Sequence, residues 1–222
     1  MERCGAHRDR RRLQAKRRGA GGGCAVELRT LHHAADDGGL VGWAQLHPLG
    51  PPEQAFLAVD IGGTNVRCGI VLPVADQGDG AVPTADVIQR EKWRHADDEA
   101  PQNDLVEGIV DMLRGLIAHA DEKRIALLPF IGIGCPGVIR RDGSIERGAQ
   151  NLPGDWQRAS FHLPRRISEN IPRIAGAPTL ALMHNDAVVQ GLSELPFMQD
   201  VRRWAALTIG TGLGNASFTN AG

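Results

Sequence analysis

The sequence predicts a mixed α/β domain whose elements follow the order βββαβαβα. Short apolar runs, each ended by glycine, proline or an Asp-Gly pair, recur along residues 56–209 and have the pattern of strands. Residues 105–117 instead carry apolar side chains at the i, i+3, i+4 spacing of an amphipathic helix. An ordinary parallel α/β domain is the alternative, and three strands ahead of the first helix disfavour it.

The first element is a hairpin over residues 56–71, which read FLAVDIGGTNVRCGIV. Its first strand ends at Asp60, and its turn consists of Gly62, Gly63, Thr64 and Asn65. Adjacent glycines allow positive φ and leave backbone N–H groups open to an anion such as phosphate. Asp60, at a strand end, is a place for Mg²⁺ that bridges phosphate oxygens. A plain hairpin with an acidic, glycine-rich turn is the alternative interpretation.

The remaining elements follow in order. A third strand is expected over residues 85–93, and the long helix follows, with Asn103 or Asp104 as its cap. A buried strand is expected over 125–133. The glycines at its end match the dinucleotide-binding pattern G-x-G-x-x-G, but that pattern must open a helix. Here the hairpin signal Asp142-Gly143 follows instead, so we reject the dinucleotide interpretation. After these we expect a helix over 161–170, a strand over 179–183, a helix over 187–195 and a strand over 204–209.

Residues 1–53 differ in composition from the rest of the chain. The first 20 residues carry eight Arg or Lys and two acids, and Gly19–Gly23 and later prolines follow. Such a segment buries little, so we expect most of this extension to be disordered. The alternative is a basic arm that binds nucleic acid, and we favour an inert tail over it. The sequence of this segment does not predict the two helices with a short turn between them that a helix-turn-helix needs.

Overall composition points to a soluble protein of a reducing, cytoplasmic setting. The 222 residues are 42% hydrophobic and 23% charged, with a formal net charge of -1, so nothing draws the chain globally to nucleic acid or membranes. No apolar run approaches the ~20 residues of a membrane helix. The four cysteines are scattered, which predicts neither a disulfide framework nor a zinc site.

Five motifs in order carry a resemblance to a known family. After the hairpin come IGIGCPGVI (131–139), NLPGDW (151–156), HNDAVVQGLSE (184–194) and LTIGTGLGNASF (207–218). Together they resemble the ROK family of sugar kinases and bacterial glucokinases, within the actin-like ATPase superfamily. The resemblance implies an RNase H-like domain over residues 54–200, followed over 201–222 by the first hairpin of a second domain. It also implies a chain truncated at its C-terminus, since family members carry a complete second domain.

The resemblance implies roles for individual residues. Asp186 matches the general base of the family, although a helix N-cap is its plain structural interpretation. Sugar contacts map onto Gly137, Asn151, Asn185 and Asp186. Phosphates of ATP map onto the first turn, with Asp60 at the metal, and onto a second glycine-rich motif of Gly210, Thr211, Gly212 and Gly214.

The implied activity is ATP-dependent phosphorylation of the 6-hydroxyl of a hexose, with glucose favoured, ATP and Mg²⁺ as cofactors and no zinc in this chain. A homodimer is allowed for full-length relatives, while no membrane or nucleic-acid partner is expected. The alternative is a non-catalytic product: a truncated kinase remnant, or a sugar-sensing regulator that lacks a helix-turn-helix.

Overall fold

The computed structural model describes residues 26–47, 54–74 and 82–220. The chain divides into two units, Met1–His32 and His33–Gly222. In the described part of the first unit, Arg29 forms an ion pair with Glu27 at 3.1 Å. The helices and sheets described below belong to the second unit.

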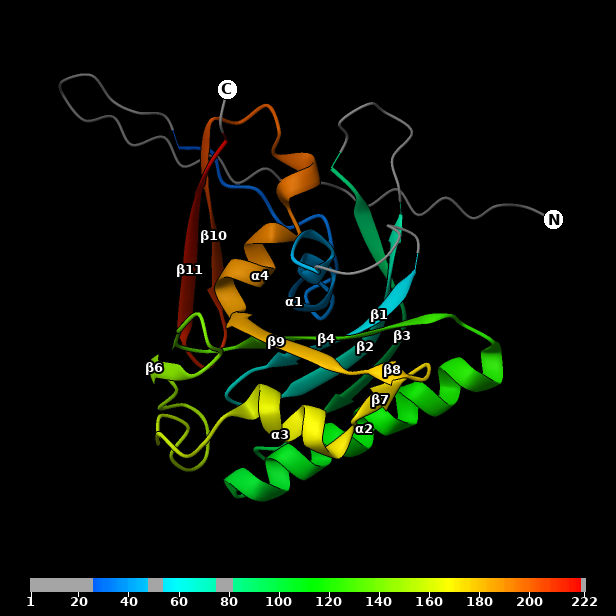
Figure 1. Cartoon of the computed structure of the whole chain (residues 1–222). Coiled ribbons are helices and arrows are strands. Elements are labelled where there is room, and N and C mark those ends of the chain that lie inside the picture. Colours follow the sequence, from blue (N-terminus) through cyan, green and yellow to red (C-terminus); the bar gives the residue numbers. More distant parts are fainter. Residues whose placement is uncertain (1–25, 48–53, 75–81, 221–222) are drawn as a thin grey trace. The chain divides into compact units, whose positions relative to one another are not determined.

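A five-stranded mixed sheet forms the centre of the second unit (Figure 1). Its order is β3-β2-β1-β4-β9. The strands are β1 (Ala55–Ile61), β2 (Val66–Val74), β3 (Thr84–Trp93), β4 (Leu127–Cys135) and β9 (Leu180–Asn185). The first three pair antiparallel, whereas β4 and β9 join β1 in parallel. The predicted opening meander and mixed sheet are therefore confirmed.

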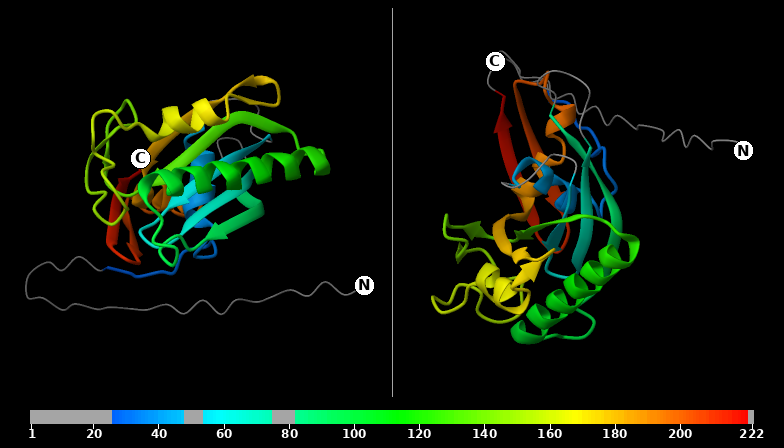
Figure 2. Two further views of the ribbon diagram at one scale, coloured as in Figure 1. Left: turned by 90° about the horizontal axis from the view of Figure 1, so that it is seen from below. Right: turned by 45° about the vertical axis from the view of Figure 1, so that its right-hand side comes forward.

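One face of the sheet is covered by two helices, α2 (Gln102–Lys123) and α3 (Leu163–Asn170), and Figure 2 shows α2 lying across the strands. Successive strand residues point to opposite faces, so alternate residues of β1, such as Leu57 and Val59, enter this core. The apolar stripe that predicted α2 faces them, because Leu105, Ile109 and Leu113 are all buried.

The opposite face of the sheet is covered by α1 (Gly38–Val41), the 3₁₀ helix η1 (Gly42–Gln45) and α4 (Asp186–Leu192). Phe56 of β1 points into this second core, where it meets Phe130, and the indole of Trp43 packs on Phe130 in turn. Trp43 lies directly on β4, because a Cβ added at Gly132 would come within 2.2 Å of the indole. Only glycine at residue 132 allows so close an approach.

Residues 33–47 correct one expectation from the sequence. They were placed in an extension that buries little, but Leu40, Val41 and Trp43 are at most 3% exposed. This short segment carries few apolar residues in a polar surrounding, and their burial depends on a sheet face formed far along the chain. Residues 1–25 and 48–53 of the expected extension lie outside the described residues.

Three small hairpins complete the described structure. They pair β5 (Val138–Ile139) with β6 (Ile145–Arg147), β7 (Arg173–Ile174) with β8 (Ala177–Pro178), and β10 (Arg203–Ile209) with β11 (Leu213–Thr219). The first confirms the hairpin predicted at Asp142-Gly143. A 3₁₀ helix, η2 (Leu195–Phe197), connects α4 to β10. None of the helices in the described part of the chain is long and apolar enough to cross a membrane.

Candidate functional site

The parallel strands bring two carboxylates to one edge of the sheet. Asp60 of β1 pairs with Gly134 of β4, which in turn pairs with His184 of β9, two residues before Asp186. Gly134 lies beside both residues: a Cβ there would be 3.7 Å from Oδ1 of Asp60 and 3.8 Å from Cα of Asp186. Ligands of open α/β sheets bind beyond such carboxyl ends of strands.

A cleft of about 450 Å³ opens at this edge. Its walls come from the turn after β1, the Pro-Gly turn after β4, the start of α4 and the tip of the β10–β11 hairpin. The cleft contains each residue that the sequence placed in a site: Asp60, Gly62, Gly63, Thr64, Asn65, Gly137, Asn151, Asn185, Asp186, Gly210, Thr211, Gly212 and Gly214. Motifs from both ends of the range between Asp60 and Gly214 thus face one space.

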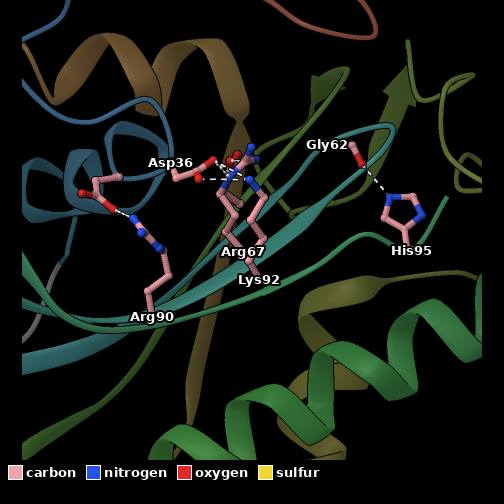
Figure 3. Close-up of polar contacts among 8 residues, drawn as sticks. Asp36, Gly62, Arg67, Arg90, Lys92 and His95 are labelled. Atoms are coloured by element: carbon pink, nitrogen blue, oxygen red, sulfur yellow. Dashed lines mark hydrogen bonds and ion pairs between the residues drawn. The ribbon is translucent and has the colours of Figure 1, made fainter. Parts of the chain in front are cut away.

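The first glycine-rich turn is held from within and from outside. The N–H of Gly62 donates to the carbonyl oxygen of Asn65 at 2.8 Å, which closes the turn. Nε2 of His95, which is 3% exposed, donates to the carbonyl oxygen of Gly62 at 2.9 Å (Figure 3). Neither Gly62 nor Gly63 has positive φ, contrary to the expectation from the sequence. The space at Gly63 is narrow, because a Cβ there would make a tight contact of 3.1 Å with Asn151.

The second glycine-rich motif meets the first directly. The hydroxyl oxygens of Thr64 and Thr211 lie 2.6 Å apart and share a hydrogen bond. Asn151 lies beside both turns, because a Cβ added at Gly212 would come within 3.0 Å of its Nδ2. The loop that carries Asn151 therefore sets the width of the cleft between the two motifs.

Asn185 organises the start of α4. Its Oδ1 accepts a hydrogen bond from the N–H of Val188 at 3.1 Å, which makes Asn185 the N-cap. Its Nδ2 donates to the carbonyl oxygen of Gly137 at 2.8 Å, so it also ties the helix to the Pro-Gly turn. Gly137 has a φ of 111°, and a Cβ there would lie 2.5 Å from the carbonyl oxygen of Arg147. Only glycine fits that turn.

Asp186 is the first residue of α4 rather than its cap. Its Oδ1 accepts a hydrogen bond from the N–H of Ala187 at 2.8 Å. Burial raises the pKa of Asp186, and this backbone hydrogen bond opposes the rise. A partly buried carboxylate with a raised pKa on a rigid helix start has the properties of a general base.

Asp60 shares the cleft with a cation that the sequence interpretation left out. Nη1 of Arg67 lies 3.1 Å from Oδ2 of Asp60. Burial raises the pKa of Asp60 to about 6; the guanidinium of Arg67 opposes this rise, and the charge of Asp186 adds to it. A further cation near Asp60 would favour its ionised form.

The residues fit a magnesium ion that is held partly by a ligand. Among the residues that the structure describes, no group of three His, Cys, Asp or Glu side chains could hold a metal by itself. Mg²⁺ in phosphate sites needs only one or two carboxylates, and phosphates and waters complete its shell. Asp60 supplies such a carboxylate at the cleft, beside the oxygens of Thr64 and Asn65.

Two residues that contact the candidate site, Arg67 and His95, were missed, and one of them had a signal in the sequence. A four-residue turn after Ile61 places Asp60 opposite Arg67 in an antiparallel hairpin, and the register confirms this pair. The opposite charges could have been paired from the hairpin alone. His95 had no such signal, because its contact with Gly62 depends on the chain path after β3.

Comparison with known proteins connects this site to a family. A family model described as the ROK family matches residues 56–221. A glucokinase from Thermotoga maritima is 27% identical over 173 residues, which cover 76% of this chain and 46% of the glucokinase. The chain therefore spans about half the length of this curated relative.

Two solved structures share the fold. An inorganic polyphosphate/ATP-glucomannokinase from Arthrobacter sp. strain KM matches with a TM-score of 0.53 and 20% identity, over 75% of this chain and 59% of its own. A ROK family transcriptional regulator, a homologue of the E. coli MLC protein, matches with a TM-score of 0.52 and 18% identity, over 76% of this chain and 37% of its own. The expected RNase H-like fold of actin-like ATPases is thus confirmed.

Proposed function

This chain belongs to the ROK family, and on that basis we propose that its cleft phosphorylates the 6-hydroxyl of a hexose with Mg·ATP, glucose being the favoured sugar. One observation carries the proposal. Asp186 lies in the same cleft as two glycine-rich motifs, which meet through the hydroxyls of Thr64 and Thr211, 2.6 Å apart. The Thermotoga maritima relative, a glucokinase, supports glucose as the sugar.

Asp186 acts as the general base in this proposal. Its carboxylate accepts the proton of the sugar hydroxyl while that oxygen attacks the γ-phosphorus. Asn185 fixes the base, because it caps α4 at Val188 and anchors the helix start to Gly137. Phosphoryl transfer depends mainly on positioning and electrostatics, so a base on a rigid helix start suits the reaction.

The two glycine-rich motifs hold the phosphates. Gly62 and Gly63 line the cleft from the first turn, and Gly210 and Gly212 line it from the second. The N–H groups of Gly62 and Gly210 close their own turns, so the other backbone N–H groups of these turns are the proposed phosphate donors. Magnesium, when bound, neutralises charge on the phosphate oxygens, and Asp60 is its protein ligand. His95 keeps the first turn in place through its hydrogen bond to Gly62.

Sugar contacts come from two loops and the start of α4. Asn151 and Asn185 offer amide groups, and Gly137 leaves the turn after β4 free of side chain. Oδ1 and Nδ2 of Asn185 each have one protein partner already, which leaves one Nδ2 proton and one Oδ1 lone pair for a ring hydroxyl.

A second candidate function is sugar binding without phosphoryl transfer. One observation favours it: a ROK family transcriptional regulator has the same fold. This second function requires the cleft to bind sugar and does not require Asp186 to accept a proton.

Both functions are tested with the purified chain. Glucose-6-phosphate is quantified with Mg·ATP and glucose, and glucose binding is followed by calorimetry in the same preparation. The kinase proposal expects turnover that is lost in Asp186→Asn and retained in Asp111→Asn, an exposed carboxylate of α2. Glucose binding without turnover in the wild-type chain would favour the second function, and the absence of both would overturn the two together.

A further inference from the structure

The segment before β1 contributes charged residues next to the cleft, although it precedes the family match that begins at residue 56. Ala35 lines the cleft, and Asp36 and Asp37 follow it immediately. Figure 3 shows the carboxylate of Asp36 between Arg67 of β2 and Lys92 of β3. An element outside the family match thus reaches the cation that contacts Asp60.

Asp36 and Asp60 hold the two ends of one guanidinium. Nε of Arg67 lies 2.6 Å from Oδ1 of Asp36, and Nη1 lies 3.1 Å from Oδ2 of Asp60. Lys92 lies 3.0 Å from the other oxygen of Asp36 and orients that carboxylate in turn. The side chains of Arg67 and Asp60 are each 18% exposed, so the contact between these two residues is largely shielded from water.

A guanidinium is a planar fork that can bind a carboxylate through two nitrogens. In this structure Nε of Arg67 donates to Asp36, so Asp60 accepts a hydrogen bond from Nη1 through one oxygen only. The other oxygen, Oδ1, has no contact with Arg67 and lies between α1 and β4, where an added Cβ would come within 2.8 Å of it at Gly39 and 3.7 Å at Gly134. Without Asp36, Arg67 could rotate and cover both oxygens of Asp60.

We propose that Asp36 is a positioning residue of the cleft, which holds Arg67 so that Asp60 keeps one carboxylate oxygen for the magnesium ion of a nucleotide. The magnesium part rests on the proposed function, whereas the orientation of Arg67 does not. Asp36 therefore acts through Arg67 and touches no reacting atom.

Asp37 provides a matched control within the same segment. It forms an ion pair with Arg90 of β3, and Figure 3 shows this contact as the dashed line at Arg90. Neither residue lines the cleft. Asp37→Asn and Asp36→Asn each remove one carboxylate that docks the segment on the sheet. A merely structural role of Asp36 therefore predicts equal effects of the two substitutions.

The first test measures Arg67 without any ligand. In ¹⁵N-labelled protein, the Nε–H signal of Arg67 is assigned by its loss in Arg67→Lys, and its exchange with water is timed. We expect a protected signal in the wild type, exchange about tenfold faster in Asp36→Asn, and no change in Asp37→Asn. An unprotected wild-type signal, equal effects of the two substitutions, or loss of the folded spectrum in Asp36→Asn alone would overturn the proposal.

The second test titrates Mg·ADP by calorimetry. We expect the Kd to rise about tenfold in Asp36→Asn, less than twofold in Asp37→Asn, and to recover partly in Asp36→Glu, which keeps the charge. If Mg·ADP binds Asp36→Asn as it binds the wild type, the magnesium part of the inference is wrong. If the wild-type protein binds no Mg·ADP, the result counts against both the proposed function and the magnesium part of the inference. The exchange measurement still decides the orientation of Arg67 in that case.

Discussion

Neighbouring residues at the start of α4 divide two tasks. Asn185 satisfies the helix N-terminus and the Pro-Gly turn, so the carboxylate of Asp186 is not used as the cap. The N-cap interpretation of Asp186 from the sequence was therefore off by one residue. Helix caps and catalytic carboxylates share the same residue types, and only the position of the first helical turn separates them.

Asp186→Asn tests the assigned base. The amide keeps a hydrogen-bonding group at the same place but accepts no proton, so we expect turnover to fall about 10²- to 10⁴-fold. Glucose affinity should change little, because the shape of the cleft is kept. Glucose-6-phosphate formation and calorimetry measure the two quantities, and full turnover in Asp186→Asn would refute the assignment.

Asp60 gives a dependence of stability on pH. Its folded-state pKa of about 6 exceeds the ordinary 3.8, so between these values the folded state binds a proton that the unfolded state releases. This contribution to stability is fully present below pH 3.8 and is lost as pH rises through 6. At pH 8 the buried, ionised carboxylate therefore destabilises the folded protein.

Asp60→Asn removes this titration. We expect the free energy of unfolding to rise by about 1 to 2 kcal/mol relative to wild type at pH 8 and to change little at pH 4. The full shift is worth about 3 kcal/mol, a value that already includes the attraction of Arg67 and is an upper bound on the change. Urea unfolding at both pH values provides the measurement, with Asp111→Asn as the exposed control. An equal change at both pH values would contradict the assigned pKa.

At the scale of elements, α1 and η1 act as the cover of one sheet face. Val71, Phe130 and Val189 come from three different elements, and all are buried in the core that Leu40 and Trp43 complete. The acidic start of the same segment pairs with cations of β2 and β3. A segment with few apolar residues can therefore form part of the folded structure when those residues pack on an apolar face of a sheet.

Trp43 tests the importance of this cover. We expect Trp43→Ala to lower the free energy of unfolding by about 3 to 5 kcal/mol, because it leaves a cavity on β4. Trp43→Phe should cost less, since the indole nitrogen is buried without a hydrogen-bond partner among the described residues. Ile88→Ala, at a side chain that is 41% exposed, is the control.

Deletions separate the extension from the cover. Removal of residues 1–32 is expected to leave the melting temperature of the sheet unit nearly unchanged, because the second unit begins at His33. Removal of residues 1–53 should lower it strongly, since Trp43 and its neighbours go with the segment. Calorimetric scans of the two shortened chains provide the comparison, and equal melting temperatures would show that the cover contributes nothing.

At the scale of the whole second unit, the cleft joins two regions that are separate in the sheet pairing. The β10–β11 hairpin forms its own two-stranded sheet, and its tip reaches the first turn through Thr211. The hairpin also packs on α4, where Phe218 contacts Gly191 closely enough to exclude a Cβ. A ligand between the two glycine-rich motifs would therefore stabilise both regions together.

Mg·ADP is expected to stabilise the chain in a metal-dependent way. At about 100 times its Kd, a ligand that binds only the folded state adds about 2.7 kcal/mol. Excess EDTA should abolish the rise in melting temperature, and Asp60→Asn should reduce it, because the metal loses its carboxylate. Differential scanning fluorimetry measures both effects. If the rise in melting temperature is unchanged in EDTA, the proposal that the site binds magnesium is wrong.

The sequence by itself determined the order of the main elements from β1 onward, the family and the members of the candidate site. Strand and helix periods follow from local burial, and the glycine-rich motifs and the Asn185-Asp186 pair are contiguous in the chain, so each is readable without the fold. Register could also have paired Asp60 with Arg67, because a short turn fixes which residues face each other.

Only the tertiary structure decided what surrounds those motifs. Four features join segments that are distant in the sequence. They are the burial of Trp43, the hydrogen bond of His95 to Gly62, the hydroxyl pair of Thr64 and Thr211, and the ion pair of Asp36 with Arg67. Such contacts depend on how the elements pack, and neither composition nor period encodes their partners. The same reason explains why residues 33–47 were taken for an extension: their apolar side chains are few, and the sheet face that buries them is formed by β1, β2 and β4.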